Sequence, residues 1–493
     1  MSKLTVKEIL KATGGRILCG SPTAVFTGVS IDSRTIKNGE LFVALKGQRF
    51  EGHDFLTAAL GSGGGALVSN PAAEPVRGRT IIVVDNTLKA LQDMAHSVRM
   101  KSSATVIGVT GTNGKTTTKE LIAAMLGVSH RVMKTSGNLN NHIGLPLSLM
   151  TIGGDEEFAV LEMGASAKGD IKHLCDMAVP DLGVITNIGL GHLEGFGSLQ
   201  MVRSTKLELA DAVKTIAVNA DDAFLMEGIS EKRATYANAP DIITFGIASK
   251  ADVSARNIVL EEGYSIFTLC IGDKGSSEVR LPVPGRFNIS NALAAASVCN
   301  ALGIDPMDIK KGMESFPGVP MRLERKAFLG ATVISDAYNA NPLSMEEAIK
   351  ELVRMRKGRT IAVLGDMLEL GSYAEEAHRK LGRWMAGLPL DVFIAVGLLM
   401  SKAAEEFTAA RKEGCVPRAG DLCEENASRG RLGSGTVVTA SDFSDARKLL
   451  LAACKEGDTI LVKGSRGTHM ERVLEGHHEE TLIPAGSESE NAL

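Results

Sequence analysis

The stretch GVTGTNGKTTTKE, residues 108–120, decides the fold. It follows the apolar run ATVI and places glycines immediately before Lys115 and Thr116. Glycines let backbone N–H groups approach phosphate oxygens, and a helix beginning near Thr116 would point its positive end at the same phosphates. Lys115 would then reach the β and γ phosphates, and the Thr116 hydroxyl would bind Mg²⁺. The stretch therefore predicts a strand, a phosphate-binding loop and a helix.

The spacing of this loop differs from the common P-loop pattern. GxxxxGK[ST] needs a glycine where Val109 stands, and Gly108 lies one residue too far from Lys115. A glycine turn with an incidental lysine is the alternative. The apolar strand pattern before the loop and the helical pattern after it favour the phosphate site.

Length and composition indicate a soluble protein of several domains. At roughly 150 residues per domain, 493 residues suggest about three. The 44% hydrophobic content and 53 glycines favour α/β architecture with many tight turns. A net charge of −4 without a block of Lys or Arg argues against nucleic acid or an anionic membrane as a partner. Seven widely spaced cysteines without a CxxC pair argue against a disulfide framework and a zinc site.

The chain carries no apolar run of about 18 residues, and its start lacks the apolar core of a signal peptide. We therefore expect a cytoplasmic protein without stable membrane insertion. We also expect it to act as a monomer.

The pattern of apolar residues predicts three units. Residues 1–84 indicate a small mixed α/β domain. Residues 85–324 alternate strands and helices at βαβ spacing, which predicts a parallel sheet with helices on both faces, and they include a β-rich insertion at about 251–284. Residues 325–493 repeat the alternation and predict a Rossmann-like C-terminal domain. From about Gly486 the polar, acidic tail is expected to be disordered.

Polar residues at strand ends are the next candidates. Glu162 closes FAVLE, and His192 lies just beyond DLGVITN. The carboxyl ends of parallel strands border the ligand crevice beside the phosphate loop, so both side chains are candidate metal ligands. A single Glu or His at such a place is more often a cap or a surface residue.

Three further groups are weaker candidates from the residues alone. Lys206 lies in a predicted helix, where a lysine is ordinarily solvated. Clusters of hydrogen-bonding groups in loops after strands are binding-site candidates, although an Asx turn or a strand-end turn also explains them. These clusters are Asp32, Ser33 and Arg34 in IDSR, and Asp336, Tyr338, Asn339 and Asn341 in DAYNANP.

With these residues placed, the whole chain resembles the Mur ligases of peptidoglycan synthesis. The resemblance covers all three domains and is most specific for the member that handles D-Ala-D-Ala. It rests on motifs that occur in order along the chain: IDSR, ELFVALKGQRFEGHDF, TGTNGKTTTKE, TSGNLNNHIGLPLSL, LEMGASAKGDI, TNIGLGHLEGFGS, NISNALAA, PMRLE, DAYNANPLSM, VLGDMLELG and VKGSRGTHME.

The resemblance implies an ATP-dependent amide ligase. It would add D-Ala-D-Ala to UDP-MurNAc-tripeptide through an acyl phosphate and release the UDP-MurNAc-pentapeptide precursor of the cell wall, ADP and phosphate. Such an enzyme contributes to cell shape and cell division. Closure of the domains about residues 320–326 would shield the acyl phosphate from water. Two prolines and a glycine interrupt the overlapping stretch FPGVPMRLE, which makes it a plausible hinge.

The resemblance also implies roles for particular residues. Lys115, Glu162, His192 and Lys206 would be catalytic. Thr116 and Glu162 would hold one Mg²⁺ and His192 another, and a carbamylated Lys206 would add a carboxylate that binds metal or orients phosphate. The implied ATP contacts are Gly111, Thr112, Asn113, Gly114, Lys115, Thr116, Thr117, Asn288, Asn291, Arg322, Asp336 and Asn339, and the implied substrate contacts are Ser33, Arg34, Asn138 and Asn140.

One position departs from the family pattern. Many relatives have a histidine before the first of the two asparagines expected near adenine, and this chain has Phe287. Tyr338 and Asn341 are expected near the site without an assigned role.

Three alternatives remain. The preceding ligase of the pathway adds diaminopimelate or lysine, but the DNPR motif of the diaminopimelate-adding enzyme is absent. Folylpolyglutamate synthase shares the loop, but its folate-binding signature is not evident. A P-loop switch that only hydrolyses nucleotide would need no UDP-binding front domain. The sequence does not determine the third residue of the peptide or the kinetic order.

Overall fold

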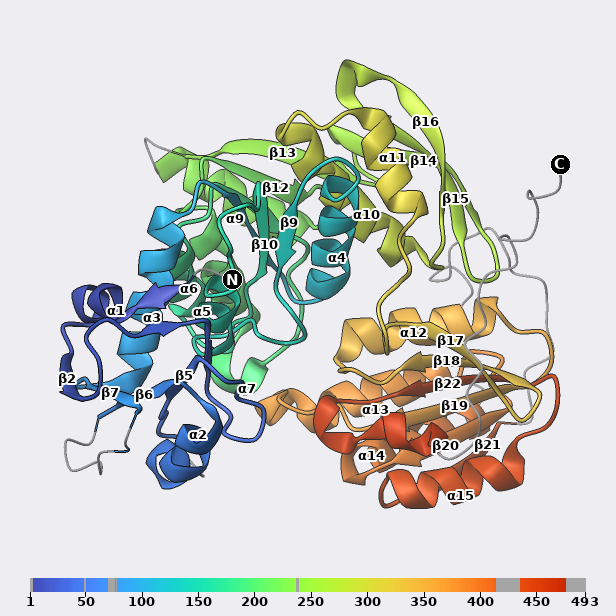
Figure 1. The fold of residues 1–493 in the computed structure, drawn as a ribbon. Helices are drawn as coiled ribbons and strands as arrows, with labels where there is room; N and C mark the ends of the chain where they lie inside the picture. Colours follow the sequence, from blue (N-terminus) through green and yellow to red (C-terminus); the bar gives the residue numbers. More distant parts are fainter. Residues whose placement is uncertain are drawn as a thin grey trace, which may run out of the picture.

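The computed structural model of the chain describes residues 3–47, 50–69, 76, 78–235, 239–413 and 435–475. The tail expected to be disordered from about Gly486 lies outside the described residues. The described chain forms three units, each built on its own β-sheet, and the first and third both adjoin the second (Figure 1). This is the three-domain α/β architecture that the sequence predicts.

The first unit is a five-stranded sheet in the order β2-β7-β6-β5-β4, parallel except for β2. Side chains of β6 alternate between two cores, because Ala66 and Val68 pack with α2 while Leu67 packs with α1 and α3. The elements are β1 (Leu4–Thr5), α1 (Val6–Thr13), β2 (Arg16–Cys19), β3 (Val25–Phe26), β4 (Gly28–Ser30), β5 (Glu40–Val43), α2 (Leu56–Ser62), β6 (Gly65–Val68) and β7 (Thr80–Val83), and α3 (Thr87–Lys101) follows as the connection to the second unit.

Helix ends in this unit follow local capping chemistry. Thr5 and Glu8 form a capping box at the start of α1, which ends at Gly14 in the left-handed region. Asn86 caps α3 by accepting from Lys89 N. Because Leu91 of α3 belongs to the apolar core that continues into the second unit, α3 joins the first unit firmly to the second.

The second unit is a nine-stranded sheet in the order β16-β15-β14-β13-β12-β11-β8-β10-β9. Strands from β9 to β14 are parallel, and β14, β15 and β16 are antiparallel. The elements are β8 (Thr105–Thr110), α4 (Lys115–Leu126), β9 (Val132–Lys134), α5 (Gly144–Leu149), β10 (Phe158–Glu162), α6 (Asp170–Ala178), β11 (Leu182–Ile185), α7 (Leu193–Phe196), α8 (Leu199–Lys206), β12 (Thr215–Asn219), α9 (Ala223–Thr235), β13 (Asp241–Gly246), β14 (Val253–Leu260), β15 (Ser265–Ile271), β16 (Ser276–Leu281), α10 (Arg286–Ala301) and α11 (Pro306–Glu314).

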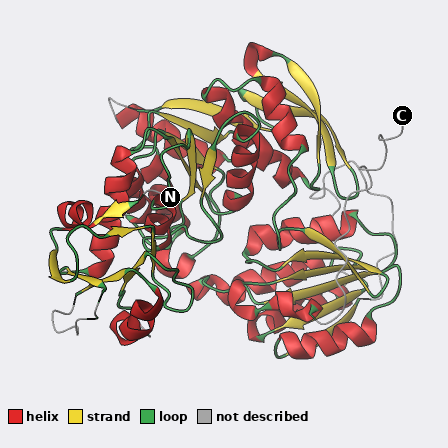
Figure 2. Ribbon diagram, viewed as in Figure 1, coloured by secondary structure: helices red, strands yellow, loops and turns green. Residues whose placement is uncertain are grey.

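Helices cover both faces of the parallel part of this sheet (Figure 2). Ile107 and Val109 of β8 pack with α4, α10 and α11, whereas Val106 packs with the opposite core that contains α3, α5 and α6. The β-rich segment expected as an insertion at about 251–284 is a continuation of the same sheet. In β15 every second side chain is buried, which fits a strand with one face on α10.

The third unit is a six-stranded sheet in the order β17-β18-β22-β19-β20-β21, parallel except for the β17-β18 hairpin. Helices α12, α13 and α14 cover one face and α15 the other. The elements are β17 (Glu324–Phe328), β18 (Ala331–Asp336), α12 (Pro342–Arg354), β19 (Thr360–Gly365), the 3₁₀ turn η4 (Gly371–Tyr373), α13 (Ala374–Met385), β20 (Val392–Val396), α14 (Leu398–Lys412), β21 (Thr436–Ala440), α15 (Phe443–Ala453) and β22 (Thr459–Lys463). Among the described helices, none has the length and apolarity needed to cross a membrane.

Candidate active site

The predicted phosphate loop lies where β8 ends, and β8 is the third strand from the β9 edge of the nine-stranded sheet. β8 lies between β11 and β10, and the chain leaves β8 to form β9 at the edge, so the strand order reverses at this point. Gly114, with φ 82, directly precedes Lys115, the first residue of α4. A Cβ at Gly114 would overlap Asn291 Oδ1, and one at Gly111 would overlap Thr186 Oγ1. Both glycines are therefore required by close packing as well as by backbone conformation.

A cleft of about 860 Å³ opens beside this loop, between the second and third units. The second unit lines it with residues 112–116, Glu162 and His192, and the third unit lines it with residues 338–341 and 368–370. The strand-end residues named from the sequence are thus brought to the phosphate loop. The cleft is shared between two units, which a single-unit NTPase site would not require.

Lys115 is held over the loop by its own backbone. Its Nζ donates to Gly111 O at 2.9 Å and to Thr112 O at 3.0 Å. Burial lowers the pKa of Lys115; the nearby Glu162 carboxylate opposes the shift and the Arg322 charge adds to it. A partly buried cation at the start of a helix is a strong attractor for an anionic phosphate.

Glu162 ends β10 with a buried carboxylate. Asn140 Nδ2 donates to Oε1 at 2.8 Å, and Glu162 N donates to Thr135 Oγ1 at 3.0 Å. Oε2 is buried without a hydrogen-bond partner among the described residues. A buried carboxylate oxygen in that state fits a cation better than it fits an apolar wall.

The described residues contain no cluster of three or more His, Cys, Asp or Glu side chains that could hold a metal alone. Magnesium is commonly bound by one or two carboxylates together with substrate phosphates. The Thr116 hydroxyl and the Glu162 carboxylate, which line the same cleft, suit that mode of binding.

Lys206 ends α8 and is only 2% exposed. The expectation that a lysine at this helical position is solvated is therefore wrong, because α8 turns this side chain inward. Nζ lies 5.8 Å from the Phe196 ring, and no hydrogen bond joins it to the part of the chain that is described. Burial lowers the pKa of Lys206 to about 7; the Lys115 charge adds to the shift and Asp170 opposes it.

His192 lies directly before α7 and lines the cleft, as its strand-end position predicts. Its Nδ1 lies 2.6 Å from Oε2 of Glu369, which belongs to the third unit. The pairing with Glu369 involves Nδ1, so Nε2 is the ring nitrogen that remains for another ligand.

Arg322 lies in the segment between the second and third units and contacts both of them. Its guanidinium stacks over the Tyr338 ring at 4.1 Å, and Nη2 lies 3.5 Å from Thr116 Oγ1. Asp336 supports the loop that follows it instead of lining the cleft, since its carboxylate accepts from Lys463 Nζ at 2.5 Å. Asn339 does line the cleft.

The two asparagines expected near adenine are buried behind the loop and do not line the cleft. Asn288 Nδ2 donates to Pro284 O at 2.7 Å, and Asn291 lies against Gly114. Phe287, the departure from the family pattern, packs against the apolar core of the third unit. The adenine assignment stays a prediction.

The four expected substrate contacts are divided between two places. Asn138 and Asn140 line the cleft. Ser33 and Arg34 lie in the turn after β4 in the first unit, where Arg34 is exposed and pairs with Asp32 at 2.7 Å. That pair holds the pKa of the Asp32 carboxyl down at about 2.

Sequence reasoning gave no role to several residues that build the site. Glu369 lies in the motif VLGDMLELG, in the loop just after strand β19. Lys463 lies in the motif VKGSRGTHME and is the last residue of strand β22. Their strand-end positions were the available signal. Asn341 pairs with Asn113 of the phosphate loop, since its Nδ2 donates to Asn113 Oδ1 at 2.7 Å.

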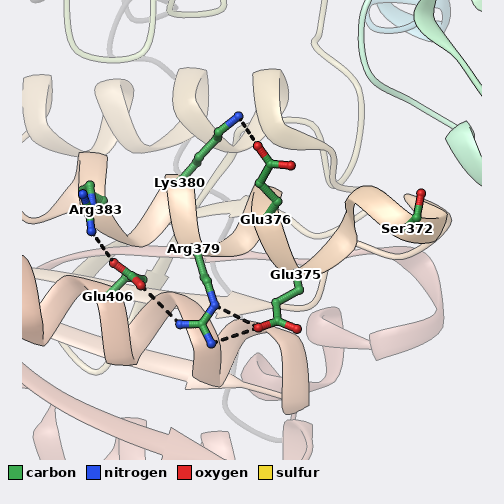
Figure 3. Close-up of a pocket in the computed structure, with 7 residues that line it drawn as sticks. All are labelled: Ser372, Glu375, Glu376, Arg379, Lys380, Arg383 and Glu406. Carbon is green, nitrogen blue, oxygen red and sulfur yellow. Dashed lines mark hydrogen bonds and ion pairs between the residues drawn. The ribbon is translucent and has the colours of Figure 1, made fainter.

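A second hollow, of about 620 Å³, lies on the outer surface of α13 and α14 (Figure 3). Its charged side chains pair with one another: Lys380 with Glu376, Arg379 with Glu375 and Glu406, and Arg383 with Glu406. These surface pairs contribute little individually, and the charges already satisfy each other. This hollow is a charge-paired surface, distinct from the cleft.

A cleft that a phosphate loop shares with a second α/β unit is typical of a nucleotide-binding enzyme whose units close on their substrates. Comparison with known proteins gives the family. Family models match residues 25–99 (Mur ligase family, catalytic domain), 109–299 (Mur ligase middle domain) and 321–466 (Mur ligase, glutamate ligase domain). The chain belongs to the Mur ligase family.

Individual relatives are similar over nearly the whole chain. The UDP-N-acetylmuramoyl-tripeptide--D-alanyl-D-alanine ligase of Bacillus subtilis (strain 168) is 35% identical, covering 98% of this chain and 100% of that protein. A crystal structure of MurF from Acinetobacter baumannii has a TM-score of 0.82 at 31% identity, covering 96% of this chain and 98% of the other. MurF from Thermotoga maritima in complex with ADP has a TM-score of 0.73 at 31% identity, covering 91% and 96%.

Proposed function

We propose that the cleft uses ATP to activate a carboxylate and then couples it to an amine. The reaction is the addition of D-Ala-D-Ala to UDP-MurNAc-tripeptide, which forms the UDP-MurNAc-pentapeptide precursor of peptidoglycan, ADP and phosphate. The observation that carries the proposal is the cleft itself, which the phosphate loop and the third unit build together. A second co-substrate can enter beside ATP there.

The first step transfers a phosphoryl group. A carboxylate oxygen of the tripeptide attacks the γ phosphorus of ATP, the bond to the β–γ bridging oxygen breaks, and ADP leaves. Lys115 and the start of α4 stabilise the charge on the phosphate oxygens. The product is an acyl phosphate, which has a far better leaving group than the carboxylate had.

The second step forms the amide. The amine nitrogen of D-Ala-D-Ala attacks the acyl carbon, the carbon–oxygen bond to phosphate breaks, and the nitrogen loses a proton. Positioning of the two reactants supplies much of the rate, and the third unit excludes water from the hydrolysable intermediate.

We infer two Mg²⁺ sites that complete the nucleotide site. Thr116 and the unpartnered Glu162 Oε2 would hold one ion, and His192 the other. When bound, magnesium would offset the negative charge on the transferred phosphate. Lys206, carbamylated, is proposed as a further anionic group at this site.

The surroundings of Lys206 suit carbamylation. Carbon dioxide reacts only with a neutral amine, and burial with a pKa of about 7 keeps much of this amine neutral near neutral pH. Carbamylation replaces an unpartnered cation beside Lys115 by an anion, which the neighbouring positive charge favours.

The carbamate can be tested directly. We expect ¹³C-labelled bicarbonate to give a carbamate NMR signal that is absent from Lys206→Ala. Short carboxylic acids should restore part of the activity of that variant. Full activity of Lys206→Ala without any added acid would rule out the proposed role.

We also propose the division of labour among the units, with boundaries 1–84, 85–324 and 325–493. The first would hold the UDP end through Ser33 and Arg34, the second ATP, and the third D-Ala-D-Ala. Asn138 and Asn140 would contact the peptide substrate. We propose a cytoplasmic monomer.

A phosphate-release assay tests the function. The protein is supplied with ATP, a panel of UDP-MurNAc peptides and a panel of amine acceptors. We expect stoichiometric phosphate release only when UDP-MurNAc-tripeptide and D-Ala-D-Ala are both present. Equal release with ATP alone would identify a hydrolase or a switch instead of a ligase.

A further inference from the structure

Glu369 and His192 join the second and third units at the edge of the cleft. Glu369 lies in the loop that follows β19, and His192 lies directly before α7. Oε2 of Glu369 is 2.6 Å from Nδ1 of His192, and both residues line the cleft. The carboxylate of one unit therefore holds the imidazole of another.

The backbone at this contact adopts an uncommon conformation, and the two turns lie close together. His192 has φ 54 and Glu369 has φ 64, so both non-glycine residues adopt the left-handed conformation. Glu194 N donates to Glu369 O at 3.1 Å, and a Cβ at Gly371 would lie 3.2 Å from Glu194 Cα. The two turns meet closely, which fixes where the Glu369 carboxylate stands.

We propose that Glu369 is a positioning residue that sets the tautomer and the orientation of His192. An ionised carboxylate is only an acceptor, so Nδ1 must carry the hydrogen, and in the neutral ring Nε2 then keeps its lone pair. Histidines that bind metals are commonly held in this way, with the other ring N–H donating to a carboxylate. Glu369 thereby prepares Nε2 for the cation assigned to His192 under the proposed function, on which this inference rests.

Because Glu369 and His192 belong to different units, metal binding at His192 depends on closure of the third unit onto the second. Glu369 belongs to the unit that is proposed to bring D-Ala-D-Ala, and His192 belongs to the unit that holds the phosphate loop. If the third unit moves away, His192 loses the carboxylate that orients it. The second metal site is thus complete only when the amine-bearing unit has docked, which restricts phosphoryl transfer to the closed enzyme.

The experiment uses the full chain and four variants: Glu369→Ala, Glu369→Gln, His192→Ala and the control Glu376→Gln. Glu376 suits the control because it is an exposed glutamate of the same unit that pairs with Lys380 on the outer surface (Figure 3). Mn²⁺ binding is measured by electron paramagnetic resonance with a non-hydrolysable ATP analogue and UDP-MurNAc-tripeptide. The Mg²⁺ dependence of kcat is measured alongside.

We expect Glu369→Ala to weaken one Mn²⁺ site by about 10- to 100-fold, as loss of such a partner commonly does. Glu369→Gln should retain most of the affinity, because its amide oxygen still accepts from Nδ1–H. The control should bind as the unaltered protein does. His192→Ala should lose the same site, and adding Glu369→Ala to it should cost nothing more.

Unchanged Mn²⁺ and Mg²⁺ dependence in Glu369→Ala, with the site lost in His192→Ala, would overturn the inference and leave the proposed metal role of His192 standing. Unchanged binding in both variants would overturn both. Equal losses in Glu369→Gln and Glu369→Ala would also overturn the positioning role. Circular dichroism checks folding, which should be retained because the Glu369 side chain is 55% exposed.

Discussion

Lys463 and Asp336 form a buried ion pair at the carboxyl ends of the neighbouring strands β22 and β18. Nζ of Lys463 lies 2.5 Å from Asp336 Oδ2, and it also donates to Asn339 O at 2.9 Å. Burial lowers the pKa of Lys463, against the opposing attraction of Asp336. The pair fixes the loop of residues 336–341 against the sheet, and residues 338–341 of that loop line the cleft.

Removal of one partner should destabilise the third unit strongly. Asp336→Leu leaves the Lys463 charge buried and unpaired, so we expect a loss of about 3–5 kcal/mol. The chain has a single tryptophan, Trp384, which packs against the core of this unit. Urea unfolding followed by tryptophan fluorescence therefore measures the stability of the third unit.

Two comparisons make the first prediction specific. The double variant Asp336→Leu with Lys463→Met should recover much of the loss, because no uncompensated charge remains. Asp445→Ala, which removes an exposed partner of Lys448, should change stability by less than about 1 kcal/mol. A loss in the double variant as large as in the single one would show that the ion pair itself carries the stability.

Local sequence was sufficient to predict the position of the phosphate loop. Apolar strands, glycine spacing and helix patterns are short-range properties, and they predict β8, the loop and α4 directly. The residue pairs that join two units are not encoded by such short-range patterns. Asn113 and Asn341 are 228 residues apart, and no periodicity within either segment encodes their contact.

Gly114→Ala should weaken nucleotide binding. The new Cβ would overlap Asn291 Oδ1, and alanine at φ 82 adds about 1–2 kcal/mol of backbone strain. We expect the loop to shift and ATP affinity, measured by isothermal titration calorimetry, to fall by at least about tenfold.

The matched control for the loop is Gly303→Ala. Gly303 has φ 77, but no atom lies within 4 Å of the place that an alanine Cβ would take. This variant carries the strain without the clash and should bind ATP normally. Equal ATP affinity in the two variants would contradict the steric explanation.

His378 should make the third unit less stable in acid. Its Nε2 accepts from Met367 N at 2.9 Å and its Nδ1 donates to Ala374 O at 2.6 Å, so the buried ring is neutral. Burial lowers the pKa of His378 below the usual 6.5. Between that lowered value and 6.5 the unfolded chain binds more protons, so the free energy of unfolding falls as the pH falls.

The dependence is measured by urea unfolding from about pH 5 to 8, with Trp384 fluorescence as the signal. The contribution of one proton is at most about 1.4 kcal/mol per pH unit. His378→Gln should flatten the acid side of the curve, and the exposed His469→Gln should leave it unchanged. A curve for His378→Gln that is as steep as the original would mean that another group controls acid stability.

The burial of Lys206 and Lys119 shows that helix patterns do not predict whether a lysine faces solvent or a polar interior. A lysine in an amphipathic helix is ordinarily solvated, yet both side chains are buried, and that of Lys119 lines the cleft. Polar residues in a helix can face either water or a polar cleft, and their identity alone does not distinguish these environments. The resemblance to the Mur ligases implies a role for Lys206. Neither the resemblance nor the helix pattern predicts one for Lys119.

Lys119 should act on catalysis through Glu162. It is 1% exposed, its Nζ donates to Thr135 O at 2.6 Å, and the same Nζ lies 2.9 Å from Glu120 Oε1. Thr135 Oγ1 in turn accepts from Glu162 N at 3.0 Å, so Lys119 fixes the residue that aligns the end of β10. In Lys119→Met we expect kcat to fall about tenfold and the Mg²⁺ requirement to rise, because the Glu162 carboxylate is less well placed. Lys134→Met provides the control, since Lys134 also pairs with Glu120 but is half exposed, and among the described residues its Nζ makes no hydrogen bond to the neighbouring Thr135. If both variants lose activity equally, the shared pairing with Glu120, and not the contact with Thr135, supports the site.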